Sequence, residues 1–241
     1  MDFSKHIQKA EEALRRRNYD FAIELYRQLI ELDANLGPAR AGLRRALLER
    51  HRAGKNKVGM FGKLKGAGPL AAAKGLVRAG KHDAAAKALE TYLGTNPADE
   101  DGNLMLGESL RDAGHMDAAL AVFEFLAELA PKRADGWREA AAIRAAQGDA
   151  SGALERLEKA LEADPRDREA QKARKDLAAT LALEGGGHGS SDHSRQRMVN
   201  SEEVMAQERV RRLHRTPEDL EAELERLEGR YAENPSDVDL L

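Results

Sequence analysis

Three residues of the sequence have the side chains of metal ligands: His188, Asp192 and His193. Imidazole and carboxylate groups commonly bind zinc and other transition metals. These three lie in a glycine- and serine-rich stretch, EGGGHGSSDHSR, with no helical spacing and no cysteine. Binding an ion would have to order that backbone at an entropic cost. We therefore expect a plain linker here, and neither a metal nor any other cofactor.

The sequence also lacks the short motifs of common catalytic sites. It contains no G-x-x-x-x-G-K-[ST] phosphate loop, no G-x-S-x-G nucleophile turn and no H-E-x-x-H zinc motif. The absence of cysteine excludes disulfides, thiolate chemistry and cysteine-based zinc sites. We therefore predict that the chain is not an enzyme. One alternative stays open: the chain could be the regulatory part of a larger enzyme.

Residues 37–65 form a strongly basic stretch in a chain whose formal net charge is only −3. Nine lysines and arginines stand there beside a single acidic residue, Glu49. With apolar residues among the lysines, the stretch could lie on an anionic membrane or contact nucleic-acid phosphates. Its single aromatic residue argues against stacking on bases, and the net charge of the chain does not indicate nucleic-acid binding. The residues of such a basic patch would be Arg44, Arg45, Arg52, Lys55, Lys57, Lys63 and Lys65.

A second interpretation of residues 37–65, which we favour, is a degenerate helix without a ligand. Runs of charge are usually solvated faces. The basic residues could also pair with residues 100–133, which hold seven acidic and three basic side chains.

The composition indicates helices with narrow apolar stripes. Hydrophobic residues make up 41% of the chain but aromatic residues only 4%, and 34% are charged. The apolar content is therefore mostly alanine and leucine, which favour helices. No stretch approaches the roughly 20 apolar residues of a membrane span, and the amino terminus has no apolar signal segment. We expect a cytoplasmic protein, and the alanine- and arginine-rich composition without cysteine is typical of bacteria.

An internal repeat with a period of 34 residues covers residues 66–167. Three copies start at Gly66, Glu100 and Ala134 and align without gaps. Each copy carries a glycine, a small residue, an apolar residue and a proline in the same register. These landmarks are Gly80, Gly114 and Gly148; Ala85, Ala119 and Ala153; Leu89, Phe123 and Leu157; and Pro97, Pro131 and Pro165. Their repetition predicts one helix–turn–helix unit per copy.

Each landmark has a structural reason. A glycine can adopt a positive φ at little cost, so it can end the first helix. A small residue allows two helices to cross closely, and the apolar residue four positions later lies on the same helix face. The proline ends the second helix.

This pattern resembles the signature of the tetratricopeptide repeat. The residues that carry the resemblance most clearly are Leu106, Gly107, Gly114, Ala119, Phe123 and Pro131. The resemblance is to a fold family and covers residues 66–167. It implies an all-α fold, a right-handed superhelix of antiparallel helix pairs, here with a helical C-terminal extension. It also implies a scaffold that binds other proteins and catalyses no reaction.

The same period gives the domain boundaries that we expect. From the amino terminus these are a first repeat (1–36), a degenerate basic repeat or linker (37–65), three consecutive repeats (66–167), a capping helix (168–184), a flexible Gly/Ser linker (185–200) and a helical extension (201–241). The extension ends like a further repeat that is cut short. The chain could therefore be a fragment of a longer protein.

In this family the first helices of stacked repeats line a concave groove that holds partners. By register, the resemblance implies that the groove residues are Leu70, Lys74, Val77, Arg78, Leu104, Glu108, Arg111, Asp112, Arg138 and Lys172. Mixed charge with some apolar positions suits an extended peptide or a helix of a partner protein. The same residues could equally form a solvated surface without a partner.

One specialised partner is not expected. Members of the family with a carboxylate clamp bind the acidic tails of chaperones through lysine, asparagine and arginine side chains. The corresponding positions here hold Leu70, Lys74, Met105, Asp135 and Glu139. Of these only Lys74 could serve, and it occupies an asparagine position.

Overall fold

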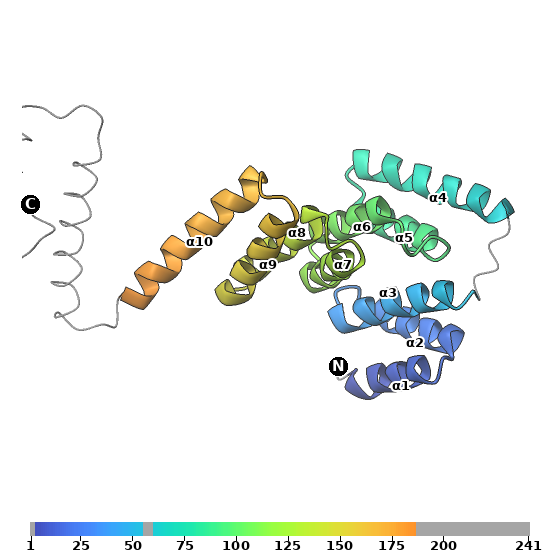
Figure 1. Ribbon diagram of the computed structural model, residues 1–241. Helices are drawn as coiled ribbons and strands as arrows, with labels where there is room; N and C mark the ends of the chain where they lie inside the picture. Colours follow the sequence, from blue (N-terminus) through green and yellow to red (C-terminus); the bar gives the residue numbers. More distant parts are fainter. Residues whose placement is uncertain (1–2, 55–59, 187–241) are drawn as a thin grey trace, which may run out of the picture. The chain divides into compact units, whose positions relative to one another are not determined.

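The computed structural model describes residues 3–54 and 60–186, which form helices with no strand among them. The compact unit that contains nearly all of them spans residues 1–182. The helices of the described residues are α1 (Ser4–Arg15), α2 (Tyr19–Leu32), α3 (Gly37–Arg52), α4 (Met60–Arg78), α5 (His82–Leu93), α6 (Glu100–Asp112), α7 (Met116–Leu129), α8 (Ala134–Ala146), α9 (Ala150–Ala163) and α10 (Arg168–Gly186) (Figure 1). The all-α prediction is confirmed. The predicted extension lies outside the described residues.

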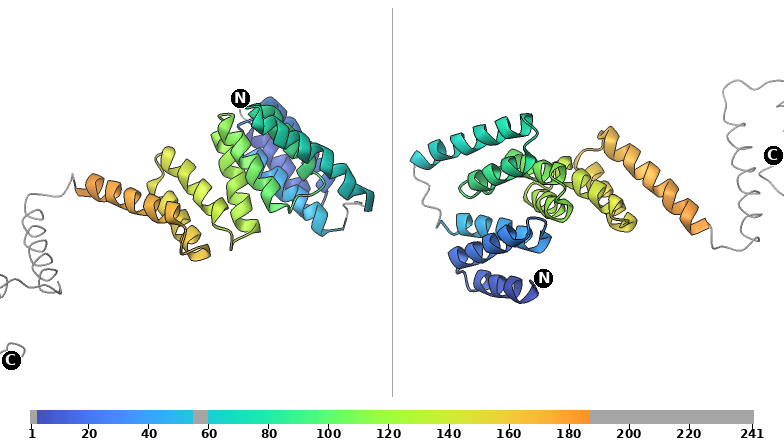
Figure 2. Two further views of the ribbon diagram at one scale, coloured as in Figure 1. Left: turned by 90° about the horizontal axis from the view of Figure 1, so that it is seen from above. Right: turned by 180° about the vertical axis from the view of Figure 1, so that it is seen from behind.

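Short turns join most of the helices into antiparallel pairs, α1 with α2, α4 with α5, α6 with α7 and α8 with α9 (Figure 2). The predicted glycines end the first helix of the last three pairs, with φ values of 67° at Gly80, 87° at Gly114 and 83° at Gly148. In each turn the amide after the glycine donates to a carbonyl near the helix end, as from His115 to Leu110 at 2.8 Å. This turn satisfies the last carbonyls and reverses the chain.

The first pair has a non-glycine residue at the same point of its turn. Arg17 stands in register with the three glycines and has a φ of 59°. The following amide, of Asn18, donates to the carbonyl of Ala13 at 2.9 Å, so the turn has the same form. A left-handed conformation costs a residue with a Cβ about 1–2 kcal/mol. The turn of the first pair is therefore strained where the other three are relaxed.

Small residues lie where paired helices cross, as predicted. Ala85, Ala119 and Ala153 are fully buried. Gly107 of α6 is packed even more closely, because a Cβ added there would lie 2.4 Å from Cε1 of the Phe123 ring on α7. The large ring therefore requires a residue without a side chain on the opposite helix.

Helix α3 departs from the regular stack. It packs on α2 and on α7, and within residues 3–54 and 60–186 it makes no comparable contact with α4. Just before α3, Asn35 accepts a hydrogen bond from the amide of Asp117 at 2.9 Å and donates one to its carboxylate at 3.3 Å. Helix α3 thus packs on the second helix of a later pair, α7, instead of continuing the array.

Helix α4 begins earlier than the repeat register predicts. It starts at Met60, ahead of the expected repeat start at Gly66, and carries Pro69 in its interior. The helix therefore extends into the stretch that we expected to be a degenerate basic repeat or linker.

The buried apolar residues form three clusters along the described chain. Helices α1–α3 share one, with Tyr26 and Leu47 at its centre, and α4–α8 share the largest, around Leu106 and Phe123. The third joins α8 and α9 to α10, whose Ala170 is fully buried while most of its other described side chains are exposed. The amino-terminal helices therefore have a core of their own.

Candidate binding groove

A pocket of about 370 Å³ lies between the first helices α4 and α6. Leu70 and Lys74 of α4 line it together with Leu104, Met105 and Glu108 of α6. Four of these residues, all except Met105, belong to the groove set derived from the repeat register. Asp99 and Asp101, at the start of α6, also line it. The structure thus brings apolar side chains, one lysine and three carboxylates to one hollow on the face of the first helices.

Two charged residues of this pocket, Lys74 and Glu108, differ in their surroundings. Glu108 is half-buried, and burial raises the pKa of its carboxyl, an effect that Arg111 opposes and Glu139 reinforces. Lys74 is exposed. Neither side chain forms an ion pair within the part of the chain that the structure describes. Both are therefore available to a ligand.

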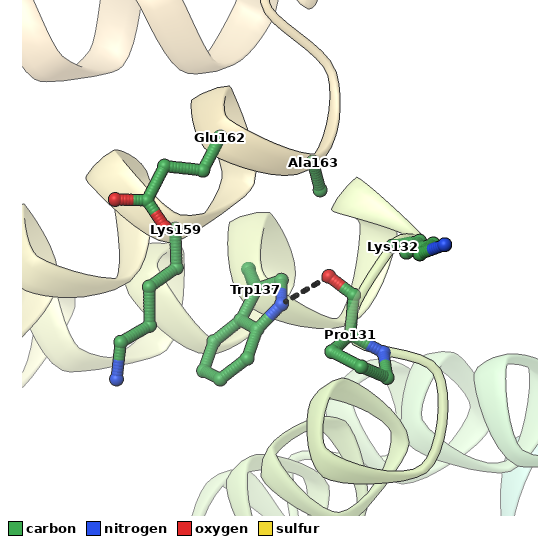
Figure 3. Close-up of a pocket in the computed structure, with 6 residues that line it drawn as sticks. All are labelled: Pro131, Lys132, Trp137, Lys159, Glu162 and Ala163. Carbon is green, nitrogen blue, oxygen red and sulfur yellow. Dashed lines mark hydrogen bonds between the residues drawn. The ribbon is translucent and has the colours of Figure 1, made fainter.

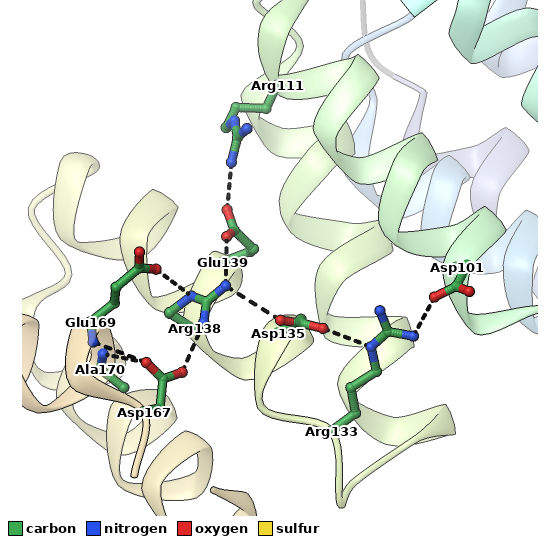
Figure 4. Close-up of polar contacts among 9 residues, drawn as sticks. All are labelled: Asp101, Arg111, Arg133, Asp135, Arg138, Glu139, Asp167, Glu169 and Ala170. Carbon is green, nitrogen blue, oxygen red and sulfur yellow. Dashed lines mark hydrogen bonds and ion pairs between the residues drawn. The ribbon is translucent and has the colours of Figure 1, made fainter. Parts of the chain in front are cut away.

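Ion pairs tie two other predicted groove residues, Arg111 and Arg138, to their neighbours (Figure 4). Arg111 of α6 pairs with Glu139 of α8. Arg138 of α8 pairs with Asp167, in the turn before α10, at 2.8 Å and lies 3.6 Å from Glu139. Burial alone would raise the pKa of Asp167, but hydrogen bonds from the Ala170 amide and from Arg138 outweigh it, so the pKa is lowered. These guanidinium groups are held in place by the fold.

The network continues to the start of α6 (Figure 4). Arg133 pairs with Asp101 at 2.7 Å and with Asp135 at 2.7 Å, which raises the pKa of its guanidinium. Asp135 in turn lies 3.3 Å from Arg138. The first helices of the last two repeats are therefore joined by charges that satisfy one another.

The remaining predicted groove residues lie away from the pocket between α4 and α6. Val77 is half-buried and Arg78 exposed in the last turn of α4. Asp112 is exposed and pairs with Arg111 at 3.1 Å. Lys172 is exposed on α10. None of these four lines that pocket.

The predicted basic patch is not a single exposed surface. Arg44 is 0% exposed. Arg45 and Arg52 are exposed on α3, and Arg52 lies 3.5 Å from Glu49. Burial removes Arg44 from any surface that could meet a membrane or a phosphate backbone. Lys55 and Lys57 lie outside the described residues, as do the side chains of Lys63 and Lys65.

Sequence reasoning missed the cluster that buries Arg44. Its guanidinium pairs with Glu90 of α5, and Arg40, 3% exposed, pairs with the same carboxylate at 2.7 Å. Burial lowers the pKa of Arg44, and Glu90 opposes that shift. We had considered residues 100–133 as the acidic partner of the basic stretch. The partner of Arg40 and Arg44 is instead Glu90, which lies in the preceding repeat. The sequence did contain one indication of this cluster: arginines occupy helix positions of α3 that are expected to face a core.

A second open pocket, of about 600 Å³, surrounds the only tryptophan, Trp137 (Figure 3). Its indole nitrogen donates to the carbonyl of Pro131 at 3.3 Å, and the ammonium of Lys159 lies 5.0 Å from the ring centroid. The indole is thus satisfied on its polar edge and stacked under a cation. This tryptophan reports on the last repeat by its fluorescence.

The described residues hold no group of three or more His, Asp or Glu side chains that could bind a metal ion. His188, Asp192 and His193 lie outside them. His115 has a structural partner instead, Asp83, at 2.8 Å. In the described part of the chain no helix combines the length and the apolar character that crossing a membrane would require.

Stacked antiparallel helix pairs with a hollow on the face of their first helices define a helical-repeat protein, or α-solenoid. Two tetratricopeptide-repeat family models match the sequence, one over residues 70–134 and the other over residues 106–182. Residues 70–182 therefore contain tetratricopeptide repeats. No curated protein matched the sequence.

Several solved structures are similar in fold at low sequence identity. YrrB, a TPR protein with an unusual peptide-binding site, is 23% identical, with a TM-score of 0.43 over 72% of this chain and 92% of that one. The Sgt2 TPR domain from Aspergillus fumigatus is 16% identical, with a TM-score of 0.48 over 52% and 85%. SycD from Yersinia enterocolitica, in complex with a peptide of the translocator YopD, is 20% identical, with a TM-score of 0.42 over 48% and 89%.

Proposed function

We propose that this chain is a non-catalytic interaction module that binds a segment of another protein, as a peptide or a helix, along the first helices of its three consecutive repeats. The observation that carries the proposal is the pocket between α4 and α6. It combines the apolar side chains of Leu70, Leu104 and Met105 with Lys74 and Glu108, neither of which forms an ion pair within the described residues. Apolar side chains with a few polar groups are typical of peptide-recognition surfaces.

The ion-pair network beyond this pocket supports the same function. Arg111 and Arg138 are fixed by Glu139 and Asp167, so the side chains there need not be ordered when a partner binds. Less entropy is then lost on association. The network extends the pocket toward α10 as a polar surface of fixed shape.

Selection from a random-peptide library on the immobilised full chain tests this function. The informative variant is Lys74→Glu with Arg78→Glu, since both side chains are exposed on α4 and neither forms an ion pair in the described residues. We expect peptides that bind the unmodified chain and lose at least about tenfold in affinity to this variant, a change of about 1.4 kcal/mol.

A control with the same charge change, Lys87→Glu with Arg166→Glu, alters exposed residues outside the pocket and should leave binding intact. Circular dichroism and melting curves verify that both variants fold. If every selected peptide binds the α4 variant as well as the unmodified chain, this face of the array is not the binding site.

A further inference from the structure

The amino-terminal helices have a concave pocket of their own. It has a volume of about 650 Å³ and lies between α1, α2 and α3. None of its lining residues lines the pocket between α4 and α6. Within the described residues, helix α3 packs on α7 and not on α4, so α1–α3 stack apart from α4 (Figures 1 and 2). The two hollows therefore belong to separate stacks of helices.

The inner wall of this pocket is apolar and closely packed. Leu14 of α1 and the Pro38 and Ala41 side chains of α3 line it. The ring of Tyr26 lies on Gly42, where an added Cβ would be 2.2 Å from Cζ of the ring. The tyrosine ring is therefore fixed in position, with its hydroxyl at the pocket.

The hydroxyl of Tyr26 has no hydrogen-bond partner within the described part of the chain. The residue as a whole is only 1% exposed, but its oxygen is not one of the fully buried unpaired atoms, so it is accessible at the pocket. It can therefore donate a hydrogen bond to an acceptor that enters the pocket.

The rim of the pocket carries an excess of uncommitted positive charge. Arg15 ends α1, Arg17 lies in the turn after it, and Arg45 is on α3; all three are exposed. None of the three arginines forms an ion pair within the described residues. Of the two acidic residues that line the pocket, Glu11 also forms none. The other acidic lining residue, Glu49, faces Arg52 at 3.5 Å.

The same charges reach the tyrosine hydroxyl. Burial raises the pKa of Tyr26, Glu11 adds to the increase, and Arg45 and Arg15 oppose it. Both arginines line the same pocket as the hydroxyl, where they attract an anionic acceptor.

We propose that this pocket is a second docking site, separate from the face of α4 and α6, for an acidic segment of a partner protein. An apolar side chain of that segment enters the pocket. A neighbouring Asp or Glu carboxylate accepts a hydrogen bond from the Tyr26 hydroxyl and pairs with Arg15 and Arg45. A basic segment would meet repulsion at this rim. A membrane surface or a nucleic-acid duplex is too large to enter a hollow of this size.

The same random-peptide selection on the full chain tests the proposal, with different variants. Arg15→Glu with Arg45→Glu reverses the rim charge, and Tyr26→Phe removes only the hydroxyl while the ring stays on Gly42. The matched control is Arg16→Glu with Arg52→Glu, which changes exposed arginines of α1 and α3 outside the pocket.

We expect a set of peptides with Asp or Glu beside an apolar residue. These peptides should bind the rim variant at least about tenfold more weakly and the Tyr26→Phe variant about tenfold more weakly, as for a hydrogen bond to a charged group. The matched control and the Lys74→Glu, Arg78→Glu variant should bind these peptides as tightly as the unmodified chain does. Melting curves verify that each variant is folded.

Three results would overturn the proposal. The selection could return no acidic peptides, or the acidic peptides could bind the rim variant unchanged. Alternatively, anionic vesicles or duplex DNA could bind through Arg15 and Arg45 while no peptide does. A loss of this second site leaves the function proposed for the α4 and α6 face untouched, because that site is tested by its own variant.

Discussion

Replacing Glu90 by glutamine should strongly destabilise the protein. The Glu90 carboxylate accepts hydrogen bonds from both Arg40 and Arg44, whose side chains are 4% and 0% exposed. Two nitrogens of Arg44 already lack partners within the described residues, so Glu90 supplies its only ion pair there. A neutral amide would leave a buried guanidinium without a counter-charge. Breaking a buried pair in this way costs about 3–5 kcal/mol.

Urea unfolding followed by circular dichroism measures this effect, with the free energy of unfolding taken by linear extrapolation. Glu12→Gln is the matched control, because Glu12 pairs with Arg16 on the surface of α1 and should contribute less than about 1 kcal/mol. Replacing Arg40, Arg44 and Glu90 together by leucine should recover most of the loss, since apolar residues often substitute for buried ion pairs and no buried charge is then left unpaired. A loss below about 1 kcal/mol in Glu90→Gln would refute the reasoning.

Three further predictions concern single residues of the array. Arg17→Gly should raise the free energy of unfolding by up to about 1 kcal/mol in urea titrations, because it relieves a positive φ; an unchanged or lower value would contradict the strain. Gly107→Ala should lower the melting temperature, with a cost of about 1–3 kcal/mol, because its Cβ would collide with the Phe123 ring; adding Phe123→Leu should restore part of the loss, and a neutral Gly107→Ala would contradict the packing. The lowered pKa of Asp167 stabilises the folded state at pH values above its unfolded pKa of about 3.9, and this stability is lost as the pH falls through the folded pKa. Asp167→Asn should therefore lower the melting temperature at neutral pH and flatten its decline in acid, whereas parallel curves for the two proteins would argue against the pairing with Arg138.

The repeat was predictable because its landmarks act locally. Gly80, Gly114 and Gly148 all adopt the left-handed conformation expected from their spacing. A turn of this kind depends on a few neighbouring residues and on the steric freedom of glycine. The helix pairs, and the side chains that pack between the paired helices, could therefore be assigned from one sequence.

The docking of α3 could not be predicted in the same way. In the sequence Arg40 and Arg44 resemble solvated charges, and their partner Glu90 is 50 and 46 residues away. No periodicity links them, since the pair depends on how two stacks meet. The pocket at Tyr26 was missed for a related reason: it needs α1 and α3 side by side around a ring that the repeat pattern assigns only to the core.

The groove between the first helices could be predicted only in part. Lys74 and Glu108 line one pocket as the register implies, because equivalent positions of successive first helices are neighbours. The spacing did not predict the ion pairs of Arg111 with Glu139 and of Arg138 with Asp167. These pairs depend on side-chain conformations, which spacing alone does not determine.

The contact of Asn35 with Asp117 has a consequence for how the protein folds. In a linear repeat array each unit touches only its neighbours, so unfolding can begin at one end and spread unit by unit. Here two residues 82 positions apart are hydrogen-bonded, which closes a long loop between the amino-terminal helices and α7. Closing such a loop costs entropy before the contact forms, and non-local contacts slow folding. The amino-terminal end is therefore fastened to the middle of the array and should melt together with it as one cooperative unit.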